Sequence, residues 1–148
     1  MLHPQGLKDF IVTSPRAILN GSSWITNEID TFGFRYCKII GILGATDAAF
    51  TAWKVQESDT SGSGMVDVPG LVAVGTTGDG RLPQGTDDDK LFAFTIDLKG
   101  RKRYLDVTAT IDTGATGGFL AILAQLSRAE EWPNTTAERG LGGYLHVP

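Results

Sequence analysis

The sequence is poor in the residues that most enzymes use for nucleophilic and metal chemistry. Its 148 residues include one cysteine, Cys37, and two histidines, His3 and His146. One cysteine cannot form a disulfide within the chain, and histidines near the chain ends suit neither a preorganised zinc site nor a histidine-dependent triad. Cys37 lies in a mostly apolar run, residues 36–43, which predicts a buried and unreactive thiol. We therefore expect no metal, no cofactor and no enzymatic activity.

Excess positive charge and long hydrophobic runs are also missing. The chain has 13 basic and 17 acidic residues, a net charge of −4, which argues against general affinity for nucleic acid. A solvated turn between strands explains the one basic cluster, residues 101–103. No segment approaches the roughly 18 apolar residues of a membrane helix, and the first ten residues lack the apolar core of a signal peptide. These absences predict a soluble cytoplasmic product without a membrane partner.

Alternation of apolar and polar residues is the strongest positive signal, and it is concentrated in residues 90–127. Three runs there have the two-residue period of a half-buried strand. Their apolar faces are Phe92, Phe94, Ile96 and Leu98, then Leu105, Val107, Ala109 and Ile111, then Leu120, Ile122, Ala124 and Leu126. The opposite side of the third run is a mixed row, Phe119, Ala121, Leu123, Gln125 and Ser127. Because glycine-containing turns separate the runs, we predict an antiparallel meander that covers a core.

The rest of the chain predicts further strands at residues 23–31, 34–43, 48–58, 65–68 and 71–74. The run 34–43 is too apolar to alternate cleanly, so we expect burial on both of its sides. Seven to nine strands with almost no helix predict an all-β fold, a single antiparallel β-sandwich of which the jelly roll is one form. Residues 1–23 are expected to be an N-terminal arm or short strands, 24–131 the sandwich, and 132–148 an irregular C-terminal tail.

Two acidic segments contain residues that known catalytic or metal-binding sites also use. Asp112-Thr113-Gly114 matches part of the aspartic-protease signature, but the chain shows neither a glycine hairpin for a flap nor the hydrophobic segment that follows the active loop. Asp-Thr-Gly is also ordinary turn chemistry. Asp79 with residues 87–89 could supply oxygen ligands to calcium, although the spacing of an EF-hand is absent. We favour a plain turn for the first segment and a solvated acidic turn for the second.

Candidate partner-binding residues lie in the irregular parts of the chain. Loops as long as residues 75–89 are usually functional or mobile within a compact domain; there we single out Asp79 and Arg81. Trp24 and Trp53 fall in predicted strands and are expected in the core. Aromatic residues outside strands are frequent interface anchors, which selects Trp132 and Tyr144 of the tail together with their neighbours Pro133 and Leu145.

Several segments together resemble the small capsid decoration, or cement, proteins of tailed bacteriophages. They are Ala-Trp-Lys-Val-Gln-Glu-Ser-Asp at residues 52–59, the strand and basic hairpin of residues 88–105, and the closing strand of residues 119–129, which ends Leu-Ser-Arg-Ala. The resemblance covers residues 36–130. Lys99 stands where these proteins are expected to have arginine, a mild departure that leaves the hairpin pattern intact.

The resemblance implies a structural role without catalytic residues. Such proteins sit on the outside of the phage head, bridge copies of the major capsid protein and often assemble as homotrimers. The implied location is the outer surface of the virion, after synthesis in the host cytoplasm. Two other functions stay open: a glycan-binding β-sandwich of a phage fibre or adhesion protein, with Trp132 or Trp53 as its aromatic platform, and a homodimeric aspartic protease.

Overall fold

A computed structural model describes residues 6–18, 20–131, 135–143 and 145 of the chain. These residues form eight β-strands and no helix. The strands are β1 (Lys8–Ile18), β2 (Ile29–Asp30), β3 (Tyr36–Thr46), β4 (Phe50–Ser58), β5 (Val66–Val72), β6 (Leu91–Asp97), β7 (Tyr104–Ile111) and β8 (Gly118–Ser127). The described residues therefore contain no helix that is long and apolar enough to cross a membrane.

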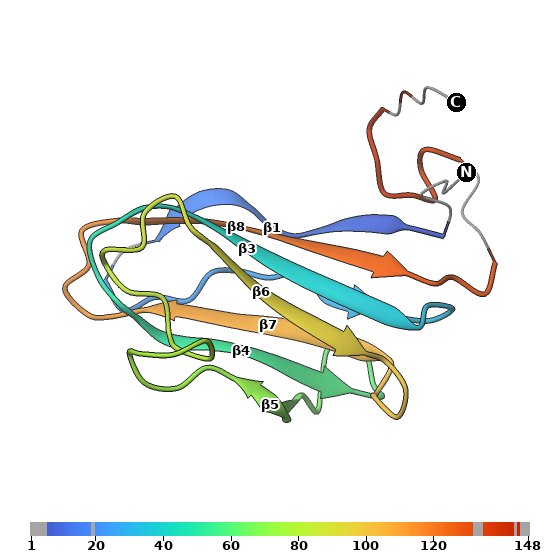
Figure 1. Ribbon diagram of the computed structural model, residues 1–148, viewed down its shortest axis with the longest axis horizontal. Helices are drawn as coiled ribbons and strands as arrows, with labels where there is room; N and C mark the ends of the chain where they lie inside the picture. Colours follow the sequence, from blue (N-terminus) through green and yellow to red (C-terminus); the bar gives the residue numbers. More distant parts are fainter. Residues whose placement is uncertain (1–5, 19, 132–134, 144, 146–148) are drawn as a thin grey trace.

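The strands form two four-stranded sheets that lie face to face (Figure 1). Sheet A has the order β1-β8-β3-β6, and sheet B has the order β2-β7-β4-β5. The strands pair as a nested series, β1 with β8, β2 with β7, β3 with β6 and β4 with β5, and every pairing is antiparallel. This is the order that results when one long hairpin is rolled into two sheets. The predicted β-sandwich is confirmed, and its form is the jelly roll.

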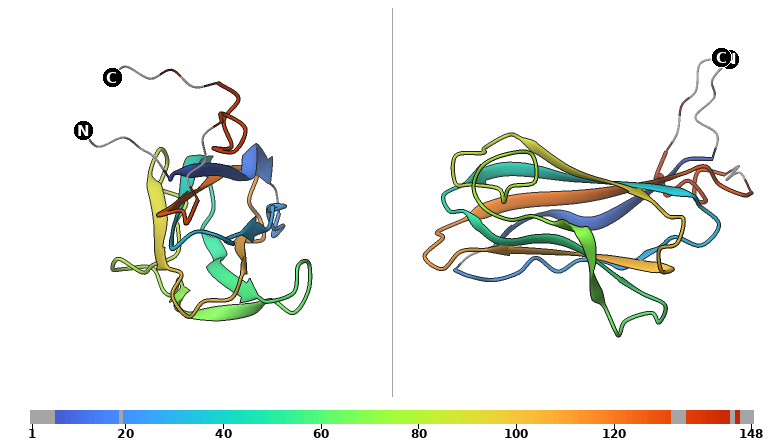
Figure 2. Two further views of the ribbon diagram at one scale, coloured as in Figure 1. Left: turned by 90° about the vertical axis from the view of Figure 1, so that its right-hand side faces the viewer. Right: turned by 60° about the horizontal axis from the view of Figure 1, so that its bottom comes forward.

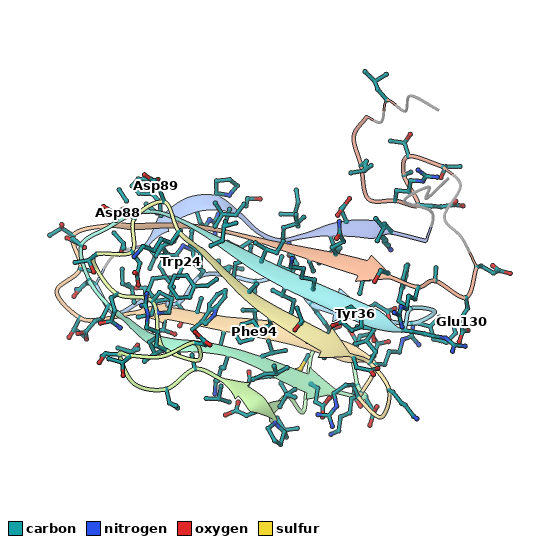
Figure 3. The ribbon with its side chains drawn as sticks, in the orientation of Figure 1. Trp24, Tyr36, Asp88, Asp89, Phe94 and Glu130 are labelled. Atoms are coloured by element: carbon teal, nitrogen blue, oxygen red, sulfur yellow. The ribbon has the colours of Figure 1, made fainter. Side chains whose placement is uncertain are left out.

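The core lies between the sheets and contains the predicted apolar faces. Residues 120, 122, 124 and 126 of β8 are buried, as are residues 105, 107, 109 and 111 of β7. Four aromatic rings pack in series at one end: Trp24 stacks on Phe50 at 5.0 Å, Phe50 meets Trp53 edge-on at 6.5 Å, and Trp53 stacks on Phe94 at 5.1 Å. Figure 3 shows Trp24 and Phe94 between the two layers. Both strand tryptophans are therefore core residues, as predicted.

A glycine in β3 makes room for this stack. A Cβ atom on Gly41 would lie 2.7 Å from the ring of Trp53, closer than real Cβ contacts. The indole thus packs directly against the backbone of the opposite sheet, and any larger residue at position 41 would force the two sheets apart.

The predicted meander is wrong. Strands β6, β7 and β8 follow one another in sequence, but none of them pairs with another. Instead β6 and β8 flank β3 in sheet A, and β7 lies between β2 and β4 in sheet B. Each turn between these strands crosses from one sheet to the other. Alternation reveals which side of a strand faces a core, but both sheets face the same core, so the pattern could not distinguish neighbours within a sheet from neighbours across it.

The expected burial of β3 on both sides is also wrong. Cys37, Ile39 and Leu43 point into the core, but Ile40 is half-buried and Ile42 is exposed. Residues 34–43 lack polar alternation because the outer face of this strand is itself apolar. We expected such a continuous apolar run to be buried on both faces of the strand, but the other described residues cover only its inner face.

The N-terminal part of the sandwich begins earlier than the sequence indicated. Residues 8–18, assigned above to an arm or short strands, form the 11-residue strand β1, which pairs with β8 along its length. Register shifts after Ile11 and Thr13 interrupt the alternation, which is why the strand signal was weak.

Residues 23–31 form less regular structure than predicted. Only β2 and an isolated bridge between Ser23 and Thr110 are strand-like. The segment divides its hydrogen bonds between the two sheets, since Trp24 N donates to Ala109 O at 3.0 Å and Asn27 N donates to Val12 O at 2.8 Å. A segment shared between two sheets cannot form a continuous ladder with either.

The two short strands predicted around Pro69-Gly70 are one strand, β5. Its register against β4 jumps between Lys54 and Gln56, so the Pro-Gly pair forms a bulge in an edge strand rather than a turn. Gly70 has φ of +83°, a conformation that favours glycine. Proline is tolerated there because an edge strand has one side without ladder hydrogen bonds.

The described part of the C-terminal tail lies beside the start of β1. Asp9 N donates to Arg139 O at 2.8 Å, and the backbone of Gly140 packs against Asp9. Residues 128–131 are irregular. Figure 2 shows residues 135–143 at the β1–β8 side of the sandwich, away from sheet B.

Candidate functional site

The outer face of sheet A is apolar over much of its area. The register of its strands places apolar side chains opposite one another in successive rows. One row is Ile11, Leu123, Ile40 and Ala93, the next is Ala121, Ile42 and Leu91, and the last is Ala17 and Phe119. We call these nine residues the apolar face of sheet A.

Several large side chains on this face are exposed. Ile42 in the centre is 47% exposed, Phe119 is 52% exposed and Leu91 at the edge is 66% exposed. Single exposed apolar residues are ordinary on protein surfaces. A contiguous patch that spans four strands is instead typical of a surface that another protein covers.

Polar residues bound the apolar face at one end. The next row along the strands is Asp9, Gln125, Lys38 and Thr95. Gln125 Nε2 donates to Asp9 Oδ1 at 3.1 Å, and the described tail segment approaches the backbone of Asp9. The tail therefore contacts the polar end of sheet A.

The outer face of sheet B is polar along β4 and β7. Asp67 accepts hydrogen bonds from Lys54 Nζ and Gln56 Nε2, both at 2.8 Å, and Thr108 Oγ1 bonds to Gln56 Oε1 at 3.2 Å. The Lys54 ammonium, with Gln56, holds the pKa of Asp67 below its usual range. These side chains satisfy one another across the strands, so this surface is suited to contact with water.

The apolar face of sheet A was not predicted as a unit. The sequence revealed its parts, the mixed outer row of residues 119–127 and the unbroken apolar run of residues 34–43. What was missing was the pairing of β3 with β8, which places Leu123 opposite Ile40 and Ala121 opposite Ile42. A run that is apolar on both sides of a strand was the available signal, and it was interpreted as burial.

A groove lies on the side of the sandwich where β6 and β5 end the two sheets. Its volume is about 530 Å³. Phe92 and Phe94 of β6 line one wall, with Trp53 at the base, and residues 70–73 and 78–81 line the other. The second wall is an irregular hairpin, since Val74 N donates to Gly80 O at 3.0 Å and Leu82 N donates to Gly75 O at 3.1 Å.

Asp87 orders the long loop between β5 and β6. Its carboxylate is buried and accepts hydrogen bonds from Arg81 Nη2 at 2.8 Å, Lys90 Nζ at 2.9 Å and Gln84 N at 2.8 Å. The Arg81 guanidinium, more than any other group, holds the pKa of Asp87 far below its usual range. The prediction of a solvated acidic turn is thus wrong for Asp87, because its charge is paired inside the loop.

The neighbours of Asp87 behave differently. Asp88 and Asp89 are exposed at the start of β6 (Figure 3), where Asp88 Oδ1 accepts a hydrogen bond from Thr46 N at 2.8 Å. Within the described ranges, no group of three His, Cys, Asp or Glu side chains could hold a metal ion.

Of the six predicted partner-binding residues, the structure brings two together. Asp79 and Arg81 both line the groove, and the Arg81 guanidinium lies 5.2 Å from the centre of the Phe92 ring. Leu145 is 99% exposed. The other three, Trp132, Pro133 and Tyr144, lie outside the described residues.

The candidate catalytic residues occupy structural positions. Asp112 lies in the turn after β7, where its Oδ1 accepts a hydrogen bond from Thr113 N at 2.7 Å, as expected for Asp-Thr-Gly in a turn. Burial raises the pKa of the Cys37 thiol to about 12, so Cys37 is a protonated core residue at neutral pH, as predicted. His3 and His146 lie outside the described part of the chain.

Carboxylates pair with the basic turn between β6 and β7. Arg103 forms two hydrogen bonds with Asp30, both at 2.8 Å, and Arg101 Nη1 lies 3.4 Å from Glu57 Oε1. Lys102 N donates to Glu57 Oε2 at 3.1 Å. The turn that crosses between the sheets is anchored to sheet B by these contacts.

Comparison with known proteins assigns no family to the chain. No protein-family model matches the sequence, and no curated protein matches it at a significant level. A jelly roll by itself does not indicate function, because viral capsid proteins, lectins and enzymes all use it. The surfaces described above therefore carry the functional argument.

Proposed function

We propose that this chain is a capsid decoration (cement) protein of a tailed bacteriophage. In this proposal it has no enzymatic activity, binds the outer surface of the head and stabilises contacts between copies of the major capsid protein. The observation that carries the proposal is the apolar face of sheet A. A surface of this kind is costly to leave in water and is expected in a protein that functions inside an assembly.

The apolar face is suited to contact between copies of the chain. Permanent interfaces between identical subunits are more hydrophobic than transient ones, and the central rows of this face contain no charged residue. We favour a homotrimer. In a three-fold ring the contact is heterologous, so the apolar face of one copy would pack against a different surface of the next.

The loop between β5 and β6 supports a second contact, to the capsid. It extends to one side of the strands (Figure 2), its residues 78–81 line the groove, and the Arg81–Asp87–Lys90 cluster holds its base in place. A rigid projecting loop loses little conformational entropy on binding. The three loops of a trimer would bind the head at the same time, which raises avidity without any single strong contact. The segment 132–148 is proposed to add to this contact.

The test has two parts, measurement of the solution mass by light scattering and pelleting with purified heads that lack this protein. A trimer that co-pellets in a constant ratio to the major capsid protein is the expected result. A monomer that stays in the supernatant would contradict both parts of the proposal. Truncation after residue 131 should weaken pelleting but leave the fold intact, and unchanged pelleting would remove the tail from the capsid contact.

A glycan-binding module of a fibre or adhesion protein is the alternative, and it has less support. Trp53, one of its two proposed platforms, is 3% exposed and stacks inside the core. Phe92 in the groove is half-buried, and a guanidinium lies over its ring. Binding to a glycan array, together with failure to pellet with heads, would favour this alternative.

A further inference from the structure

The edge of β6 is open in a way that the other sheet edges are not. Sheet A ends at β1 and β6, and sheet B ends at β2 and β5. The β1 edge is covered, because Val12 O accepts a hydrogen bond from Asn27 N and Asp9 N donates one to Arg139 O. β2 has two residues, and the proline and bulge described above interrupt β5. β6 has seven residues and pairs with β3 without a register shift.

The register shows which backbone groups of β6 face outward. Leu43 N donates to Lys90 O and Leu98 N donates to Arg35 O, so residues 90, 92, 94, 96 and 98 direct their backbone groups to β3. Leu91, Ala93, Thr95 and Asp97 therefore direct theirs to the other side. None of these four amide groups donates to another described residue. Proteins usually protect such an edge, because it is a template for another strand.

The groove lies directly beside this edge. A strand added along β6 would direct alternate side chains inward, past Phe92 and Phe94, into the space of about 530 Å³. Its other side chains would lie next to Leu91 and Ala93 and extend the apolar face of sheet A by one strand. Main-chain hydrogen bonds and alternating pockets are the two components of peptide recognition by strand addition.

Charge at the two ends of β6 favours one orientation of such a strand. At the first end, Arg81 and Lys90 carry two positive charges, and Asp79, Asp87, Asp88 and Asp89 carry four negative charges. At the other end, the charge of Asp97 is offset by the exposed Lys99. A complementary segment would place a cation at the first end, beside Asp88 and Asp89.

We infer that an extended segment of the major capsid protein docks along β6 as a fifth strand of sheet A and fills the groove with alternate apolar side chains. The identity of the partner rests on the proposed function. The wall formed by residues 70–73 and 78–81 lines the same groove as the edge, so the incoming segment would contact both.

The first test replaces one outward-facing amide. Thr95→Pro removes an amide hydrogen of the open edge without removing a hydrogen bond to β3, a position where proline is tolerated. Thr95 lies outside the apolar face of sheet A, and Thr95→Ser, which keeps the amide and the hydroxyl, is the matched control. We expect Thr95→Pro to weaken pelleting with heads at least tenfold, with an unchanged trimer mass and unfolding temperature, and Thr95→Ser to bind as the parent protein does.

Hydrogen exchange on the unaltered protein is the second measurement, and it tests the inference if Thr95→Pro does not fold. Binding to heads should slow exchange at the outward amides of residues 91, 93, 95 and 97. Binding to heads without added protection in this segment, or a folded Thr95→Pro variant that binds normally, would overturn the inference alone. A variant with altered mass would assign the edge to contact between copies and also overturn it. Failure of the unaltered protein to bind heads would overturn the proposed function as well.

Discussion

The two sheets are alike on their inner faces and different on their outer faces. Inside, both contribute buried aliphatic residues at every second position. Outside, sheet B presents Lys54, Asp67 and Thr108 in a hydrogen-bonded network, whereas sheet A presents Ile42, Phe119 and other apolar residues. The inner faces form the common core, and both consist of the same kind of residue. The difference between the outer faces has no role in closing the sandwich, and it therefore points to function.

The inner faces should contribute equally to stability. Leu126 in sheet A and Leu105 in sheet B are both buried, and replacement of each by alanine should lower the free energy of unfolding by about 4 kcal/mol. Urea unfolding of the two variants measures this, with the exposed Leu145→Ala as control. A much smaller loss at one position would show that the sheets do not share a single core.

The loop that connects the sheets should depend on its buried carboxylate. Asp87→Asn leaves Arg81 and Lys90 without their common partner and should destabilise the protein by about 3 kcal/mol at pH 7. Asp89→Asn is the control, because that side chain is exposed and asparagine tolerates the φ of +59° at this position. Unfolding curves of equal midpoint for the two variants would contradict the structural role of Asp87.

The same variant should also change the pH dependence of stability. Because the folded state lowers the pKa of Asp87, its contribution is complete above the unfolded value of about 4 and is lost as the pH falls below it. The difference in stability between the parent protein and Asp87→Asn should therefore shrink below about pH 4. A difference that is constant from pH 7 to pH 2 would exclude this ion pair as its source.

The outer faces should differ in association. Ile42→Lys places a charge at the centre of the apolar face of sheet A and should weaken self-association at least tenfold, about 1.4 kcal/mol. Thr51→Lys places the same charge on an exposed position of sheet B and should have no effect. Light scattering over a range of protein concentrations tests both variants. Equal association of all three proteins would remove the apolar face from the proposed contact between copies.

The polar network of sheet B should contribute least. Asp67→Asn removes the partner of Lys54, but Asp67 is exposed, and ion pairs at the surface contribute little in water. We expect a small shift of the unfolding midpoint at low salt that disappears at about 0.5 M salt, and no change in association. A large effect that persists in salt would mean that this surface is covered in the folded assembly.

Much of the fold could be predicted from alternation. Residues 92–98, 105–111 and 120–126 were each assigned the correct buried side, and the loop of residues 75–89 was located correctly. The prediction failed where a strand is irregular, as at the bulges of β1 and β5, because a register shift breaks the two-residue period. It also failed in β3, because an apolar outer face gives the same pattern as a buried one.

The candidate site was less predictable than the fold. Asp79 and Arg81 were selected from the loop, and they do line the groove, but no sequence pattern indicated that Arg81 also pairs with a buried carboxylate. The apolar face of sheet A combines residues from β1, β3, β6 and β8 that are more than 100 positions apart in the chain, as Ile11 and Leu123 are. Composition and spacing carry no information about such neighbours.

By itself, the sequence determined the strand-forming segments, the buried side of most of them and the shortage of groups for catalysis, because these depend on residue type and local period. Tertiary structure alone decided that consecutive strands alternate between sheets, that three outer rows from four strands merge into one apolar face and that β6 is left with an open edge beside a groove. Those properties depend on which strands become neighbours. Neighbours are chosen by closure of the whole core, a global condition that no short stretch of sequence contains.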